Sequence, residues 1–249
     1  MAHVPKARPD ATCARCQPRF DPTYRSGMRA AALFDIHGNV DALEAVLAAA
    51  AVAGCDRLLL GGDYAYLGPA PAEVVDVLLA YPGEVIAIRG NTDRMIANGD
   101  DAVACWAGER LGDERVAWLR ELPEQVAVVE HGALLVHATP RSDEERLLPD
   151  TDLGRADAML AGVVAKTVLC GHVHLQYRRV VGAVEVVNPG STGLPLDGET
   201  TAAWAIVDDG VVSLQRTEYD LERTLARLAA APLHPAGALV RRRLRTALP

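Results

Sequence analysis

Apolar and polar residues follow a regular alternation through the first half of the chain. Short apolar runs typical of buried strands occupy residues 29–34, 57–60 and 85–88. Apolar residues from Leu43 to Ala50 recur at helical spacing after Asn39, which can cap a helix that Gly54 ends. Pro71 suits the first turn of a second helix. A third helix, after an irregular stretch, is expected to carry Val116, Trp118 and Leu119. Strands that alternate with helices predict parallel strands joined by right-handed crossovers.

The second half of the chain has a different pattern, in which paired apolar runs flank short turns. Hairpins are expected from residues 126–129 with 133–136, 178–181 with 184–187, and 202–207 with 211–214. Residues 168–170 form one further strand, and residues 221–230 form a closing helix. The tail RRRLR is interpreted as a solvated basic end, with partner binding as the alternative. We therefore expect one domain over residues 28–249, with a parallel half packed against an antiparallel half.

Composition restricts the class of protein. Half of the 249 residues are hydrophobic, which is enough for a sizeable core. The net charge of −8 argues against general nucleic-acid binding. No apolar run reaches the roughly 18 residues of a membrane span, so we expect no membrane association. Five cysteines, an odd number, favour free thiols in a reducing compartment, and hence the cytoplasm.

The N-terminal residues 1–27 are polar and lack periodicity, and we expect a disordered extension there. Cys13 and Cys16 have the spacing of a zinc or redox motif. A structural zinc site needs four ligands, and no second pair of cysteines follows. We interpret them as an inert thiol pair.

Residues with metal-binding side chains follow the predicted strands one after another. In open α/β sheets, ligands bind outside the carboxyl ends of the strands. These positions hold Asp35, His37, Asp63, Asn91, His137, His172 and His174. Taken alone, Asp35 could be a helix cap, GGD could be a turn, and His137 could be a hydrogen-bonded core residue. A metal-binding side chain after five successive strands is improbable as a coincidence. His131, His3 and His234 do not follow strands, and we expect them to be exposed.

Imidazoles and carboxylates together suit borderline divalent cations such as Mn²⁺, Fe and Zn²⁺. Two such ions about 3.5–4 Å apart require a bridging carboxylate. Asp63 follows a central strand and is the natural bridge.

The motifs DxHGN (35–39), GGD (61–63), GNxD (90–93), VH (136–137), GHxH (171–174) and NPGS (188–191) resemble those of the calcineurin-like metallophosphoesterases, in particular the small bacterial and archaeal phosphodiesterase branch. The resemblance covers residues 28–215. It implies an α/β fold in which two packed mixed β-sheets, flanked by helices, form a four-layer α/β/β/α sandwich.

The resemblance also assigns roles to residues. It gives one cation the ligands Asp35, His37, Asp63 and His174, and the other Asp63, Asn91, His137 and His172. Mn²⁺ is the first expectation, with Fe, Zn²⁺ or Ni²⁺ as alternatives. It implies catalytic roles for Asp63, Asn91 and His172, and substrate binding by Asn39, Asn91 and Thr92. A hydroxide that bridges the metals would attack phosphorus.

Thr92 departs from the family pattern, because many of the phosphatases have histidine at this position. A threonine hydroxyl cannot be a general acid at neutral pH. We therefore expect hydrolysis of small phosphodiesters. The alternatives are a phosphomonoesterase or protein phosphatase, a dinucleoside polyphosphate hydrolase, and a non-catalytic scaffold. A homo-oligomer is left open. Because protonated histidine cannot bind a cation, we expect metal occupancy to fall as the histidines titrate near pH ~6.5.

Overall fold

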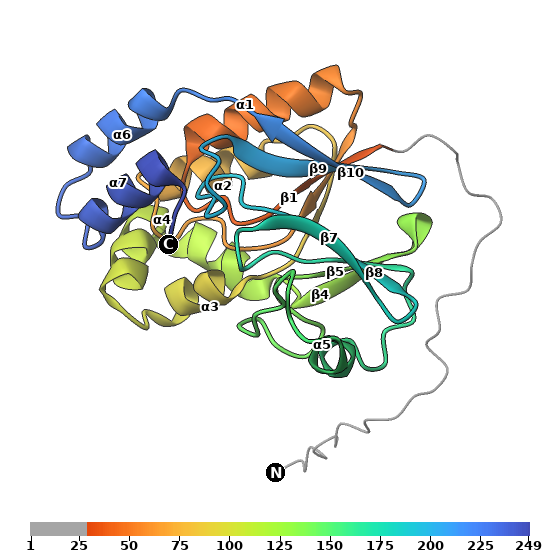
Figure 1. The fold of residues 1–249 in the computed structure, drawn as a ribbon. Coiled ribbons are helices and arrows are strands. Elements are labelled where there is room, and N and C mark those ends of the chain that lie inside the picture. The colour runs from red at the N-terminus through yellow and green to blue at the C-terminus, as the bar shows by residue number, and fades with distance from the viewer. Residues whose placement is uncertain (1–28) are drawn as a thin grey trace, which may run out of the picture.

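Two five-stranded mixed sheets lie face to face in the computed structural model, which describes residues 29–249 (Figure 1). Across the first sheet the order is β10 (Val211–Thr217), β9 (Ala202–Asp208), β1 (Ala30–Leu33), β2 (Arg57–Leu60) and β3 (Glu84–Ala87). Across the second it is β4 (Gln125–Val128), β5 (Ala133–Val136), β6 (Thr167–Leu169), β8 (Val184–Pro189) and β7 (Gln176–Val181).

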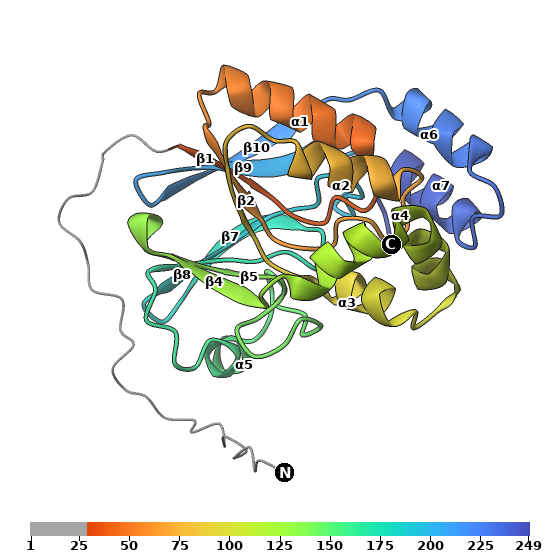
Figure 2. The same cartoon turned by 180° about the vertical axis from the view of Figure 1, so that it is seen from behind.

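Helices cover the outer faces of both sheets. They are α1 (Val40–Val52), α2 (Pro71–Leu79), α3 (Asn91–Asn98), α4 (Ala102–Glu121), α5 (Leu153–Met159), α6 (Leu221–Ala230) and α7 (Gly237–Thr246), with a 3₁₀ turn at Val129–His131. Figures 1 and 2 show α1 and α2 over the first sheet and α5 beneath the second. The four-layer sandwich is thereby confirmed. No helix among residues 29–249 is both long and apolar enough to cross a membrane.

The alternation of side chains along β1 explains why the two sheets pack. Ala30 and Ala32 belong to the apolar layer between the sheets, whereas Ala31 and Leu33 belong to the layer beneath the helices. All four are fully buried, as expected for a strand covered on both faces. Small alanines here allow the second sheet to approach the first closely.

The first helix forms as the sequence predicts. The Asn39 side chain accepts a hydrogen bond from the Ala42 amide at 3.1 Å, which caps α1. Gly54 follows with a φ of 75°, the left-handed conformation that ends a helix at little cost. Pro71 begins α2, and the hairpin strands match their predicted positions closely.

The division into a parallel and an antiparallel half was wrong. Strand β9 pairs antiparallel with β1, so the last hairpin completes the first sheet. In the second sheet, β5, β6 and β8 are parallel to one another. A hairpin pattern predicts which two strands pair with each other, but it does not determine which sheet the pair joins.

Other expectations also need correction. The stretch predicted to be irregular contains α3 and the start of α4, a helix broken at Gly112, where φ is 71°. His131 is buried, 4% exposed, rather than an exposed turn residue. His234 is half-buried, because its ring packs against Trp106 with 4.3 Å between centroids. The RRRLR tail lies within α7, whose Val240 and Leu244 are buried.

The expectations for His3, Cys13, Cys16 and the extension 1–27 lie outside the described residues and stay predictions, as do the domain bounds. The described cysteines Cys55, Cys105 and Cys170 are free thiols.

Candidate metal centre

The seven predicted ligands converge from both sheets. Asp35, His37, Asp63 and Asn91 follow strands of the first sheet, and His137, His172 and His174 follow strands of the second. Asp35, His37, Asp63, His172 and His174 have φ between 47° and 68°. Left-handed backbone is unfavourable for residues other than glycine by roughly 1–2 kcal/mol each. Such strain concentrated on five neighbouring side chains is typical of a functional site.

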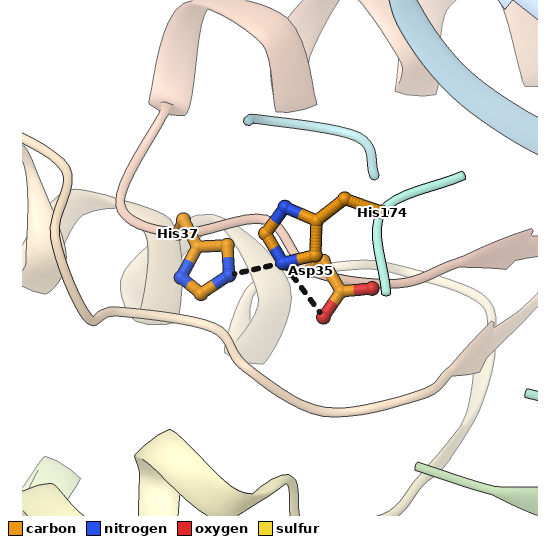
Figure 3. A group of neighbouring side chains, drawn as sticks. All are labelled: Asp35, His37 and His174. Atoms are coloured by element: carbon orange, nitrogen blue, oxygen red, sulfur yellow. Dashed lines mark hydrogen bonds and ion pairs between the residues drawn. The ribbon is translucent and has the colours of Figure 1, made fainter. Parts of the chain in front are cut away.

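The inner group consists of Asp35, His37 and His174 (Figure 3). The two Nε2 atoms of His37 and His174 lie 3.0 Å apart, and His174 Nε2 lies 3.5 Å from Asp35 Oδ1. The exposed fraction of each residue is 0% for Asp35, 3% for His37 and 6% for His174. Three potential ligand atoms therefore face one another in a buried space.

Hydrogen bonds fix which nitrogen of each inner histidine carries the proton. His37 Nδ1 donates to the Tyr66 carbonyl at 2.9 Å, and His174 Nδ1 donates to the Leu194 carbonyl at 2.6 Å. Since a carbonyl only accepts, both Nδ1 atoms are protonated, and in neutral rings both Nε2 atoms carry lone pairs. Asp35 Oδ1 is buried without a hydrogen-bond partner in the described part of the chain. Two facing lone pairs and an unpaired carboxylate oxygen fit a cation between them.

Asp63 lies between the inner group and an outer group formed by Asn91, His137 and His172. Its Oδ2 is 3.7 Å from His37 Nε2, and its Oδ1 is 3.4 Å from His137 Nε2. Each carboxylate oxygen therefore faces a different group, as a bridging ligand requires.

The outer group centres on Asn91, the first residue of α3. Its Oδ1 lies 2.9 Å from His137 Nε2 and 3.1 Å from His172 Nδ1. His137 Nδ1 donates to the Gly61 carbonyl at 2.8 Å, which turns Nε2 toward the site. Asn91 and His172 are partly exposed, so this group opens toward solvent.

Burial makes every titratable group of the site favour its neutral form. It raises the pKa of Asp63 to about 6, and burial together with the Asp63 charge raises the pKa of Asp35 well above its usual value. Burial lowers the pKa of His174 to about 3, and it also lowers the pKa values of His37, His137 and His172. In the protein without cations, burial therefore places the pKa of Asp63 above that of His174, the reverse of the order of the free side chains. A bound cation favours ionised carboxylates and neutral imidazoles.

Asp93, the last residue of the GNxD motif, holds the Asp63 loop in place. Its fully buried carboxylate accepts hydrogen bonds from the amides of Asp63 at 2.7 Å, Tyr64 at 3.0 Å and Gly90 at 2.9 Å. The Thr92 amide donates to Asp63 Oδ1 at 3.0 Å. Three hydrogen bonds to one buried carboxyl group fix the loop that presents the predicted bridge.

The NPGS motif braces the other ligand loops. Asn188 donates to the Gly171 carbonyl at 2.8 Å, next to His172, and Ser191 donates to the Asp35 carbonyl at 2.6 Å. Gly171 itself has no left-handed φ; a Cβ there would lie 2.7 Å from Asp35 Oδ2. The turn is made at His172, where φ is 68°, and the glycine leaves room for the carboxylate.

An open pocket of about 400 Å³ lies over the site. His37, Asp63, Asn91, Thr92, His172 and His174 line it. Arg146, from the loop 141–152, and Arg243, from α7, also line it. No residue of the range 98–112 lines it. Asn39 lies outside it, with its amide donating to the Gly193 carbonyl at 2.9 Å, so its role in substrate binding stays a prediction.

A model of the calcineurin-like phosphoesterase superfamily domain matches residues 28–210 of the sequence. The chain belongs to this superfamily. Residues that carry its motifs are those that the structure brings together, which confirms the resemblance to the small prokaryotic branch.

Similar proteins support the same placement. Phosphodiesterase YfcE of Escherichia coli strain K12 is 28% identical over 188 residues, which cover 72% of this chain and 87% of the relative. The uncharacterized protein MJ0912 of Methanocaldococcus jannaschii is 26% identical over 232 residues, 80% of this chain and 90% of that protein. A solved metallophosphoesterase from Sphaerobacter thermophilus shares the fold, with a TM-score of 0.74 at 23% identity, over 90% of this chain and 100% of the other.

Sequence reasoning missed several residues around the site. Asp93 and the NPGS residues were recognised within motifs but had no assigned role, because the burial that makes them loop braces is a property of the folded structure. Arg243 was interpreted as solvated. The i, i+4 spacing of Val240 and Leu244 could have revealed the helix that places it.

Proposed function

We propose that the protein hydrolyses small phosphodiesters with the aid of two divalent cations. The inner cation would be held by Asp35, His37, Asp63 and His174, and the outer one by Asp63, Asn91, His137 and His172. The observation that carries this proposal is the pair of unprotonated Nε2 atoms of His37 and His174, 3.0 Å apart beside the unpaired Asp35 Oδ1. Without a cation, this buried arrangement places lone pairs against one another at a cost in free energy.

When bound, the cations supply charge neutralisation of the phosphoryl oxygens and an activated water. The protein's own residues would position the cations and the substrate. Asp63, on a loop braced by Asp93, would hold both cations. Asn91 and His172, partly exposed at the pocket, orient the phosphoryl group. Mn²⁺ is the expected ion, with Fe, Zn²⁺ or Ni²⁺ as alternatives, and the cytoplasm is the expected location.

Thr92 supports diesters over monoesters as substrates. It lines the pocket beside Asn91, where a histidine could protonate a leaving group. A threonine hydroxyl cannot do so near neutral pH, so substrates with good leaving groups are favoured. The Escherichia coli relative carries the name phosphodiesterase, in agreement with this choice.

A matrix of metals and substrates tests the proposal. Metal-free full-length protein would be loaded with Mn²⁺, Fe²⁺, Zn²⁺ or Ni²⁺. Each form would be assayed with a bis-aryl phosphodiester, an aryl monoester, 2′,3′- and 3′,5′-cyclic nucleotides and a dinucleoside polyphosphate. We expect turnover only with metal and a higher kcat/KM for the diester than for the monoester. An Asp63→Asn preparation, purified identically, corrects for contaminating phosphatases. Diester turnover by the metal-free protein would refute the metal requirement, and a monoester preference would refute the substrate class.

A further inference from the structure

The C-terminal helix α7 packs against the segments that hold the inner group. Its Val240 and Leu244 form an apolar cluster with Leu67, Leu194 and neighbouring residues. The Leu194 carbonyl accepts the His174 Nδ1 proton, and Leu67 follows Tyr66, whose carbonyl accepts the His37 Nδ1 proton. The position of α7 relative to the inner histidines is therefore fixed by packing. Figures 1 and 2 show α6 and α7 side by side at this end of the molecule.

One of the four arginines of α7 faces the pocket. Arg241 is exposed, Arg242 donates to the Pro249 main-chain oxygen at 2.7 Å, and Arg245 lies 3.8 Å from Glu222. Arg243 instead lines the pocket together with His37 and His174. Its Nε is buried without a hydrogen-bond partner among residues 29–249, and no carboxylate of that region forms an ion pair with it.

The surroundings of Arg243 disfavour the charged form of its side chain. Burial and the charge of Arg242 both lower the pKa of Arg243, and Arg243 contributes to the lowered pKa values of His37 and His174. A partly buried guanidinium without a counter-ion is costly, and two nearby cations would increase that cost. An anion bound in the pocket would offset it.

Charge balance indicates what that anion is. Two divalent cations would bring four positive charges, and Asp35, Asp63, the expected metal-bound hydroxide and a simple phosphodiester would together bring four negative ones. Arg243 adds a positive charge at the inner end, and Arg146 adds another on the side of His172, whose pKa it lowers. A substrate with a further phosphate would balance this excess and could form paired hydrogen bonds with the planar guanidinium.

We propose that Arg243 binds a second phosphate group of the substrate at the inner end of the pocket. This inference rests on the proposed function and narrows it to phosphodiesters that carry a further phosphate group besides the reacting one. In this arrangement, α7 determines substrate specificity as well as covering the inner group.

Binding of two nucleotides that differ by one phosphate tests the inference. Calorimetry on Mn²⁺-loaded full-length protein would compare adenosine 5′-monophosphate with adenosine 3′,5′-bisphosphate, and chromatography would check that both remain intact. The variants are Arg243→Met, Arg243→Lys and the matched control Arg241→Met, an exposed arginine on the same helix. Metal content and melting temperature are measured for each, so that a change in occupancy or folding is recognised.

We expect the wild type to bind the bisphosphate on the order of tenfold more tightly, since bonds to charged groups contribute this much. Arg243→Met should reduce the ratio to about one without changing monophosphate binding. Arg243→Lys should retain part of the preference, and Arg241→Met should retain all of it.

An equal affinity for both nucleotides in the wild type would overturn the inference, as would an unchanged ratio in Arg243→Met or an equal loss in Arg241→Met. Failure of the proposed function is separate from these results. A protein without diester turnover that still shows the Arg243-dependent ratio would refute hydrolysis and retain the second phosphate site.

Discussion

The inner and outer groups are built from similar side chains but differ in how they are held. Asp35, His37 and His174 are nearly inaccessible, and both inner imidazoles are tied to main-chain carbonyls beneath α7. In the outer group, His137 is tied in this way and His172 has a hydrogen bond to the main chain of Glu144, but Asn91 and His172 are partly exposed and contact one another at the pocket surface. Similar ligands are thus placed in a rigid, covered setting and in an open one.

This difference indicates a division of labour between the two groups. Hydrogen-bonded second partners orient metal-binding imidazoles and raise their affinity for metal. We expect the inner group to retain its cation and the outer group to exchange its cation and contact substrate. The predictions below test the contrast, beginning with the largest effect.

Removing the Asp63 carboxylate, which both groups would share, should abolish the difference between the inner and outer groups. Asp63→Asn keeps the shape of the side chain but cannot supply two anionic oxygens to two cations. We expect turnover to fall by on the order of a thousandfold and metal content to fall in both groups. Elemental analysis and steady-state assays measure the two effects. Asp56→Asn, an exposed position, is the control. Full activity at normal metal content would disprove the bridge.

Removing one imidazole from each group should separate the two cations. His37→Ala should deplete the inner cation and His137→Ala the outer one, each leaving about one ion per chain. Native mass spectrometry gives the stoichiometry, and competition with a chelator gives the release rate. We expect the remaining ion to exchange faster in His37→Ala than in His137→Ala. Equal release rates would show that coverage by α7 does not distinguish the groups.

Acid should weaken metal binding through Asp63 rather than through the histidines. In the metal-free fold the pKa of Asp63 is raised to about 6 and that of His174 is lowered to about 3. The raised carboxyl pKa stabilises the metal-free fold below the unfolded value of about 3.9, and this contribution is lost as pH rises through about 6. The lowered imidazole pKa acts oppositely, with stability present above pH about 6.5 and lost as pH falls through about 3.

A cation binds ionised Asp63, so below pH 6 it must displace a proton. The increase in melting temperature on addition of Mn²⁺ should therefore grow between pH 5 and pH 7. Differential scanning calorimetry at matched ionic strength measures it. A shift that is constant from pH 5 to pH 8 would contradict this assignment.

The smallest expected effect comes from placing a histidine at position 92, on the outer side of the pocket. Thr92→His offers an imidazolium for leaving-group protonation, and we expect the ratio of monoester to diester turnover to rise by about tenfold or more. Assays with both aryl esters at equal metal content measure the ratio. Thr92→Asn, which has no acid, serves as the control. An unchanged ratio in both variants would remove the main sequence argument for diesters.

The meeting of these seven side chains could be predicted from the sequence, because strand order and side-chain chemistry point the same way. Asp35 and His137 each follow an apolar run directly, Asp63 follows one after two glycines, and parallel strands bring their carboxyl ends together. The pairing of β9 with β1 could not be predicted, because it depends on packing between segments about 170 residues apart in the chain. Neither could the pKa order, since burial is a property of the assembled site.

Helix α7 was missed in the sequence for a different reason. Its arginines dominate the composition and conceal the two apolar positions, Val240 and Leu244, that dock it. The buried His131 was missed for a similar reason: a polar residue in a hairpin turn is normally solvated, and only the neighbouring chain encloses it.

The distribution of the ligands over both sheets has a consequence for how the protein unfolds. Asp35 and His37 are separated from His174 by more than half of the described chain, yet the three meet in one cluster. A cation bound there would act as a removable cross-link that closes a long loop, and cross-links of this kind lower the entropy of the unfolded chain. Separation of the sheets would first require release of the ion. The lifetime of the folded state would then depend on the metal supply, and removal of the ion by a chelator would determine the rate at which the chain unfolds.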